Sequence, residues 1–231
     1  MTLDVDLAGV GLHILGGFEV SEADGDLPHS PITGDFPKIG LMVGNAGSAL
    51  WPILQDSAEA RDGHPHPLDR WTQRIITELC ERKGLSAVYP FGGPPWWPFV
   101  TWAKRTGQFS PSPLGVLVHQ HYGPWSAFRG VILGDETLLE LAPAGVGSGP
   151  CPTCMDKPCL TVCPVNAISL DEPYDYKACR SHVTTSWPAE TADGDQPTCS
   201  TGCLARKACP VGTEYRYAPA HGRFHMAAFR G

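Results

Sequence analysis

The chain has 231 residues, of which 42% are apolar, and seven of these are tryptophans. It therefore has enough apolar material to bury a sizeable core in one large domain or in two smaller ones. The formal net charge of -7 gives no general attraction to nucleic acid or to an anionic membrane, because neutralising phosphates requires clustered Lys and Arg.

Export and membrane insertion are not expected either. The N-terminal segment MTLDVDLAGVGLHILGG has acidic residues where a secretory signal has a basic start. A run of about 18 consecutive apolar residues, the minimum for a spanning helix, occurs nowhere in the sequence. We therefore expect a cytoplasmic protein with no membrane and no nucleic-acid partner, in a compartment that keeps thiols reduced.

The first half of the sequence predicts a mixed domain of class α/β (α+β). Residues 1–37 are rich in Gly, Asp and Pro and predict a short strand or two and a loop. A buried strand is expected at residues 38–44, followed by a helix within residues 45–57. The clearest helix is residues 68–84, where apolar residues recur at helical spacing and Gly84 provides the stop.

The following segments continue the mixed pattern up to a break near residue 145. We expect a strand at residues 85–91, a Pro-rich loop at 91–99, a short helix at 100–107, and two strands within 115–133 joined across residues 119–125. Small residues and Pro then fill residues 141–150. Since such segments commonly separate domains, we predict an N-terminal domain of residues 1–145 and a C-terminal domain of residues 146–231.

Eight of the nine cysteines fall between positions 151 and 209. In a reducing compartment this clustering favours metal binding over disulfides. The run CPTCMDKPCLTVCPVNAI resembles the ligand pattern of two-cluster ferredoxins. In that pattern, closely spaced cysteines bind one cluster and the cysteine before Pro binds the other. Cys163 precedes Pro164, and a second such pair is Cys209 and Pro210.

The sequence therefore predicts two 4Fe-4S clusters with four thiolates each. The ligands expected for the first cluster are Cys151, Cys154, Cys159 and Cys209, and those for the second are Cys163, Cys179, Cys199 and Cys203. Structural zinc also takes four cysteines in CxxC pairs, but the two Cys-Pro ends favour iron-sulfur. Cys80, on the apolar face of the predicted helix, is expected to be a buried core residue.

The N-terminal part resembles CblC-type cobalamin-processing proteins over most of residues 38–134. The segments that carry this resemblance are PKIGLMVGNAGSALWPIL, HPLDRW and SPLGVLVHQHYGPWSAFRGVIL. The resemblance implies a nitroreductase-like fold with a mixed sheet and helices, binding of cobalamin with its lower base displaced, and removal of the upper axial ligand. The residues that match the family's cobalamin-contacting segment are His119, Tyr122, Gly123, Trp125 and Arg129. Flavin ranks below cobalamin, because no basic phosphate-binding cluster stands out in this region.

The C-terminal segments YDYKACRSHVTT and GCLARKACP are similar to the ferredoxin module of epoxyqueuosine reductases and reductive dehalogenases. Both of those protein classes place clusters beside cobalamin. Arg206 stands in a run where that module has another cysteine, and Cys199 is expected to replace it from upstream. The tail, residues 215–229, has an apolar helical stripe, and we assign no chemistry to its histidines, His221 and His225.

Together these features predict an iron-sulfur protein that takes electrons from an unknown donor and delivers them to cobalamin. One alternative is a cobalamin-dependent reductase of an organic substrate. Another is a noncatalytic electron carrier or cobalamin chaperone. The resemblance is also compatible with a homodimer.

Overall fold

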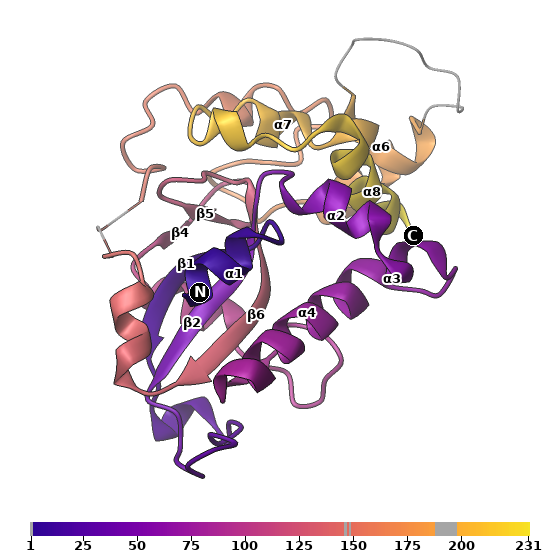
Figure 1. The fold of residues 1–231 in the computed structure, drawn as a ribbon. Coiled ribbons are helices and arrows are strands. Elements are labelled where there is room, and N and C mark those ends of the chain that lie inside the picture. Colours follow the sequence, from indigo (N-terminus) through magenta and orange to yellow (C-terminus); the bar gives the residue numbers. More distant parts are fainter. Residues whose placement is uncertain (1, 146, 148, 188–197) are drawn as a thin grey trace. The chain divides into compact units, whose positions relative to one another are not determined.

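The computed structural model describes residues 2–145, 147, 149–187 and 198–231 (Figure 1). These residues form two compact units. Unit 1 comprises residues 1–109 and 126–147, and unit 2 comprises residues 110–125 and 148–231. The second boundary between the units, after residue 147, falls close to the boundary predicted after residue 145. Residue 146 lies outside the described residues. That residues 110–125 join the C-terminal unit was not predicted.

Unit 1 is built on a four-stranded antiparallel sheet. In spatial order the strands are β1 (His13–Glu19), β2 (Ile39–Ala46), β6 (Ser126–Gly134) and β3 (Ser86–Val88). Every residue of β2 is buried, as its continuous apolar run predicted. The expectation of a chain of mixed helices and strands is confirmed.

Helices and short turns cover this sheet. They are α1 (Leu3–Ala8), η1 (Glu22–Asp24), α2 (Leu50–Asp56), α3 (Ala58–Arg61), α4 (Pro67–Lys83), α5 (Phe99–Arg105) and η2 (Glu136–Leu141). Helix α4 lies along β6 and β3, with Ile76 against Gly130 (Figure 1). It begins with Pro in its first turn and ends at Gly84, whose φ of 66° needs a residue that tolerates left-handed backbone. Cys80 is 3% exposed on the inner face of α4, which confirms its core role.

A buried carboxylate ties η1 to α5 within unit 1. Asp24 Oδ1 accepts hydrogen bonds from Trp102 Nε1 at 2.7 Å and from Arg105 Nη1 at 2.5 Å. Its Oδ2 accepts from the Ser21 backbone N–H at 2.9 Å. Burial alone raises the pKa of Asp24, but the hydrogen bonds from Ser21, Arg105 and Trp102 outweigh burial and hold the pKa below its usual value.

Replacing Asp24 by Asn is expected to destabilise unit 1 by about 1–3 kcal/mol at neutral pH, because charge-assisted hydrogen bonds are lost. The pKa of Asp24 is lower in the folded protein, so its stabilisation is present above the pKa of the unfolded chain. This stabilisation is lost as the pH falls through the lowered pKa. Thermal unfolding followed by circular dichroism measures the difference, with Asp26→Asn, at a neighbouring exposed position, as the control. Equal unfolding temperatures for the two variants at neutral pH would contradict the role of Asp24.

Unit 2 has little regular structure and is organised around its loops. Its elements are the strand pair β4 (Phe109–Pro111), whose first residue belongs to unit 1, and β5 (Leu117–His119), then η3 (Pro158–Leu160), α6 (Tyr176–Thr185), η4 (Cys199–Thr201), α7 (Leu204–Lys207), η5 (Thr213–Tyr215) and α8 (Pro219–Arg230). The two strands expected on either side of residues 119–125 both form, as β5 and β6. They belong to different sheets, and a single bridge between His119 and Gly123 closes the turn after β5.

Within the described part of the chain, no helix is long and apolar enough to cross a membrane.

Candidate metal centres

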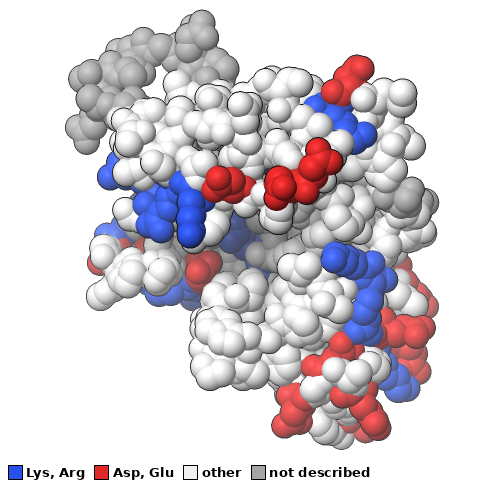
Figure 2. Space-filling view, turned by 180° about the vertical axis from the view of Figure 1, so that it is seen from behind, with Lys and Arg blue, Asp and Glu red and all other residues white. Residues whose placement is uncertain are grey.

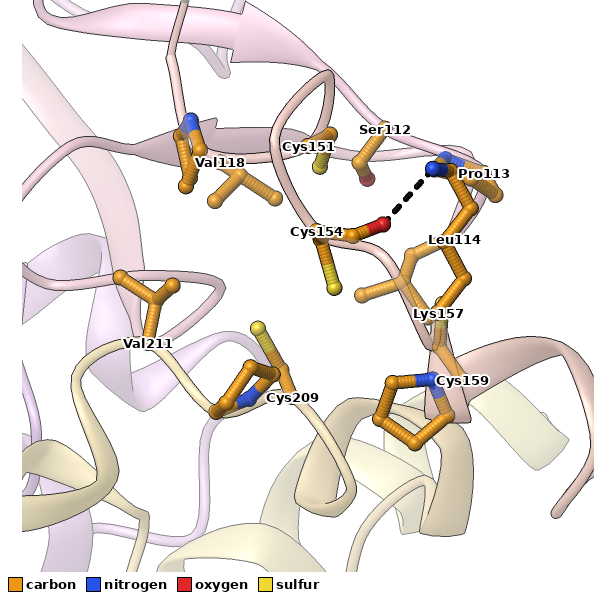
Figure 3. A pocket seen from close by; sticks show the side chains of 13 residues that line it. Ser112, Pro113, Leu114, Val118, Cys151, Cys154, Lys157, Cys159, Cys209 and Val211 are labelled. Atoms are coloured by element: carbon orange, nitrogen blue, oxygen red, sulfur yellow. Dashed lines mark hydrogen bonds between the residues drawn. The ribbon is translucent and has the colours of Figure 1, made fainter.

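Four cysteines of unit 2 line one apolar cavity, which we call site 1 (Figure 3). The cysteines are Cys151, Cys154, Cys159 and Cys209, and the wall is completed mainly by Leu114, Val118, Val211 and four prolines at positions 113, 150, 158 and 210. A turn in which the Cys154 N–H donates to the Cys151 carbonyl at 3.3 Å places the first two thiols. In Figure 3 the sulfur atoms of Cys154 and Cys209 point into the same space. These are the four residues predicted for the first cluster.

The electrostatics of site 1 disfavour four free thiolates. Burial raises the pKa of the Cys151, Cys159 and Cys209 thiols, and neighbouring sulfurs of the same set raise it further. Lys157 opposes this effect at Cys151 and Cys159, and its Nζ donates to the Cys154 carbonyl at 2.8 Å (Figure 3). A bound cationic metal centre would relieve this repulsion and keep the thiols deprotonated.

The other four cysteines form a second set, which we call site 2. It consists of Cys163 after η3, Cys179 in α6, Cys199 in η4, and Cys203 at the start of α7. Burial raises the pKa of the Cys199 thiol, and Cys203, Cys179 and Cys163 raise it further, which places the four sulfurs in one electrostatic neighbourhood. These are the residues predicted for the second cluster.

Backbone and side-chain donors approach the sulfurs of site 2. The Ala167 N–H donates to Cys163 Sγ at 3.3 Å. Backbone N–H groups of α7 lower the pKa of the Cys203 thiol, although burial raises it more. Lys207 lies beside this set, and burial lowers the pKa of its ammonium group while Cys199 and Cys203 raise it. Hydrogen bonds to sulfur are a main determinant of cluster reduction potential.

Tyr174 is a site residue that the sequence did not reveal. Burial raises the pKa of its hydroxyl, and a hydrogen bond with Cys179 adds to this effect. Cys203 and Cys163 raise the same pKa, and both cysteines pack with Tyr174 against one small apolar core. The ring is fixed by Gly115, where an added Cβ would lie 3.0 Å from it. The sequence prediction of cluster ligands used only the spacing of cysteines, and that spacing contains no information about a nearby tyrosine.

The two sites share a small apolar core. Leu114, Ile168 and Ala205 form it, and the partly buried residues packed against it are Cys159, Leu160, Cys163, Tyr174 and Cys203. Cys159 belongs to site 1 and Cys163 to site 2, and the Cα atoms of residues four apart are at most about 14 Å from one another. The two sites are therefore close neighbours.

The donor chemistry of both sites fits a 4Fe-4S cluster, whose ligand set is four cysteine thiolates. The thiols of site 1 surround a cavity rather than meeting at one point. Among the residues that the structure describes, no three His, Cys, Asp or Glu side chains group closely enough to hold one metal ion.

Four of the five predicted cobalamin contacts lie together in unit 2. His119 is 3% exposed, and its Nδ1 accepts hydrogen bonds from the backbone N–H groups of His121 at 3.1 Å and Tyr122 at 3.2 Å. Gly123 has a φ of 58°, and a side chain there would overlap the Val211 carbonyl. This segment is therefore a tightly held turn, in which the His119 ring already has a structural role.

Trp125 is the fourth predicted contact in unit 2, whereas Arg129, the fifth, belongs to unit 1. Trp125 is buried in unit 2, where the Arg206 guanidinium lies 5.0 Å from its ring centroid. Arg206 also lies 4.7 Å from the centroid of the Tyr217 ring, so its guanidinium is held between two aromatic rings. Arg129 is in β6 of unit 1, where its Nε donates to Asn45 Oδ1 at 3.0 Å.

Two histidine contacts complete unit 2. His221 is fully buried, stacks on Tyr217 at 4.1 Å between ring centroids, and has its Nε2 atom 3.0 Å from His225 Nε2. The exposed His121 has its Nε2 atom 2.9 Å from the Tyr215 hydroxyl.

Comparison of the chain with models of known protein families and with curated proteins gives no match.

Proposed function

We propose that this chain is an iron-sulfur electron-transfer protein that holds one 4Fe-4S cluster at site 1 and another at site 2. The observation that carries the proposal is that four of the eight thiols line one cavity, that the other four are electrostatic neighbours, and that Cys159, Cys163 and Cys203 of the two sets pack on one apolar core. Such clusters, when bound, supply one-electron redox chemistry at low potential. The cysteines would hold them, while the prolines of site 1 and the shared core limit access of water.

Groups beside the thiols are placed to favour the more negative, reduced state. The Lys157 ammonium lies near the sulfurs of site 1, and the Ala167 N–H donates to a sulfur of site 2. A cation or hydrogen-bond donor stabilises negative charge on sulfur and so raises the reduction potential. The two sites have different neighbours of this kind, so we expect two different potentials.

Replacing Tyr174 by Phe is expected to lower the reduction potential of one cluster and leave that of the other unchanged. The variant loses the hydroxyl that hydrogen-bonds with Cys179 of site 2 but keeps the ring that packs on the core. The measurement is a redox titration followed by EPR, alongside an iron count that should stay at the wild-type value. Tyr176→Phe is the matched control, because this side chain is 53% exposed. Two unchanged potentials, or equal shifts in both, would show that Tyr174 does not tune site 2.

We propose further that the electrons pass to cobalamin as the substrate and remove its upper axial ligand reductively. The turn that the resemblance assigns to cobalamin packs directly against the chain that carries Cys209. Gly123 is in contact with the Val211 carbonyl, and Gly212 with the Tyr122 carbonyl. An acceptor bound at this turn would therefore lie beside site 1, and loss of its lower nitrogen ligand would make its cobalt easier to reduce.

An anaerobic titration with hydroxocobalamin, with and without reductant, tests the cobalamin step. Visible and EPR spectra should show a base-off cobalt species that forms only with protein present. Unchanged cobalamin spectra would contradict this step while leaving the iron-sulfur proposal intact, since the iron content is measured separately.

A second candidate, reduction of an organic substrate with bound cobalamin, is favoured by the pair formed by His121 and Tyr215. Reductions of this kind need a proton donor, and this exposed pair is one. Turnover of an organic acceptor in molar excess over cobalamin would favour this candidate, and its absence would favour cobalamin as the substrate.

A further inference from the structure

Four cations on two helices of unit 2 form a continuous surface, which we call the basic patch. Lys177 and Arg180 border one surface hollow beside α6. Arg180 Nε and Nη2 each donate to the Arg230 carbonyl at 3.1 Å, which joins α6 to α8. Arg223 and Arg230 of α8 both lie over the Trp187 ring, at 5.1 and 4.9 Å from its centroid. These contacts link the four cations into one patch.

The basic patch contrasts with the charge of the rest of the chain. The whole chain has a formal net charge of -7, yet neither α6 nor α8 contains an Asp or Glu. In the ranges of the chain that the structure describes, the acidic side chain next to α6 in the sequence is its capping residue Asp175, which accepts a hydrogen bond from the Ala178 N–H. On the face drawn in Figure 2, most of the surface is uncharged and Lys and Arg side chains gather in a few separate patches.

The basic patch lies on the elements that carry site 2. Helix α6 holds Cys179, has Val183 buried on its inner side, and exposes Lys177 and Arg180. Helix α8 packs against η4, which contains Cys199, so closely that a side chain at Gly222 would overlap the Thr201 carbonyl. The basic patch and two of the thiols of site 2, Cys179 and Cys199, therefore lie on the same helix or on elements in direct contact.

We propose that the basic patch is the docking surface for the electron donor, and that the donor is a small acidic electron-carrier protein. The proposal rests on the proposed function and adds the place where electrons enter, which is site 2. In this step the carrier is oxidised by one electron and unit 2 is reduced by one, with no bond formed and no proton moved. Opposite charges on the two proteins would speed and orient their encounter. Arginines beside aromatic rings can also bind nucleic acid, but the net charge of the chain disfavours that partner.

The test is the rate at which a reduced acidic flavodoxin transfers electrons to the cluster-loaded protein in anaerobic stopped flow. The variants are Lys177→Glu and the double variant Lys177→Glu with Arg223→Glu, and Arg180 is left in place because it joins the two helices. Arg82→Glu is the control, since Arg82 is an exposed residue of α4 in unit 1 and its reversal changes the net charge as much as Lys177→Glu does. Reduction by a small uncharged photoreductant is measured on every protein to show that the clusters remain reducible.

We expect the double variant to be reduced about 10-fold or more slowly by flavodoxin at low salt, and the difference to shrink as salt is added. The Arg82→Glu variant should match the wild type, and all proteins should respond equally to the photoreductant. Equal rates for the patch variants and the control would overturn the proposal. So would a loss of binding to an RNA oligonucleotide without a change in electron-transfer rate. If the wild type itself contained no iron, the proposed function would fail instead.

Discussion

Replacing Cys154 by Ser is expected to reduce the iron content from about eight to about four atoms per chain, because one of the two proposed 4Fe-4S clusters would lose a ligand. Cys154 lines site 1 and does not belong to the set at site 2. The matched control is Cys80→Ser, which removes a thiol from the core of unit 1 and should leave the iron content unchanged. Iron and acid-labile sulfide are counted on protein purified without oxygen.

Replacing Cys203 by Ser extends this experiment to site 2. It should also leave about four iron atoms, but the EPR signal that survives should be the one that Cys154→Ser removes. Loss of iron in the Cys80→Ser variant, or survival of the same signal in both site variants, would contradict the assignment of the thiols to two sites.

Replacing Gly212 by Ala is expected to remove the cluster at site 1, although no ligand is changed. Gly212 has a φ of 66°, and an added Cβ would overlap the Tyr122 carbonyl. Neither backbone can move away easily, because the facing Gly123 is itself pressed against Val211. We expect the chain around Cys209, three residues before Gly212, to shift, with loss of about four of the eight irons per chain and a lower unfolding temperature.

The control for this prediction separates backbone strain from the steric overlap. Gly63 in unit 1 has a similar φ of 74° but no atoms within 4 Å of an added Cβ. Gly63→Ala should therefore cost only the left-handed strain, about 1–2 kcal/mol, and should keep all the iron. Equal iron contents in the two glycine variants would show that the contact between residues 122 and 212 does not hold site 1 together.

Local sequence signals were sufficient for much of unit 1. Helix α4 was predicted because its apolar residues follow helical spacing and Gly84 ends it, and strand β2 because its apolar run is continuous. The cavity lined by Cys151, Cys154, Cys159 and Cys209 contains the four cysteines that the Cys-Pro pattern grouped together, whereas their binding of a cluster stays a prediction. These signals act over a few residues or come from a ligand spacing that the chemistry restricts.

Contacts between distant parts of the chain could not be predicted in this way. The assignment of residues 110–125 to unit 2 depends on packing against residues near 211 and 174, about 50–100 positions away along the chain. Tyr174 reaches site 2 through a tertiary contact, and Arg206 is held by rings of Trp125 and Tyr217. No short-range periodicity encodes such contacts, since they arise only when the loops of unit 2 meet.

The cobalamin contacts remain a prediction that rests on the resemblance. The structure groups His119, Tyr122, Gly123 and Trp125 in one turn beside site 1, and it places Arg129 in unit 1. Because His119 Nδ1 accepts two backbone hydrogen bonds, a His119→Ala variant would disturb the turn itself. A change in cobalamin binding by that variant alone would therefore not identify a direct contact.

The most direct test of the two-cluster assignment is a count of iron and acid-labile sulfide in the wild-type protein, purified without oxygen and examined by EPR after reduction. About eight irons and eight sulfides per chain, with signals from two interacting reduced clusters, is the predicted result. About four of each would assign site 2 to another role, and zinc without sulfide would contradict the iron-sulfur assignment altogether.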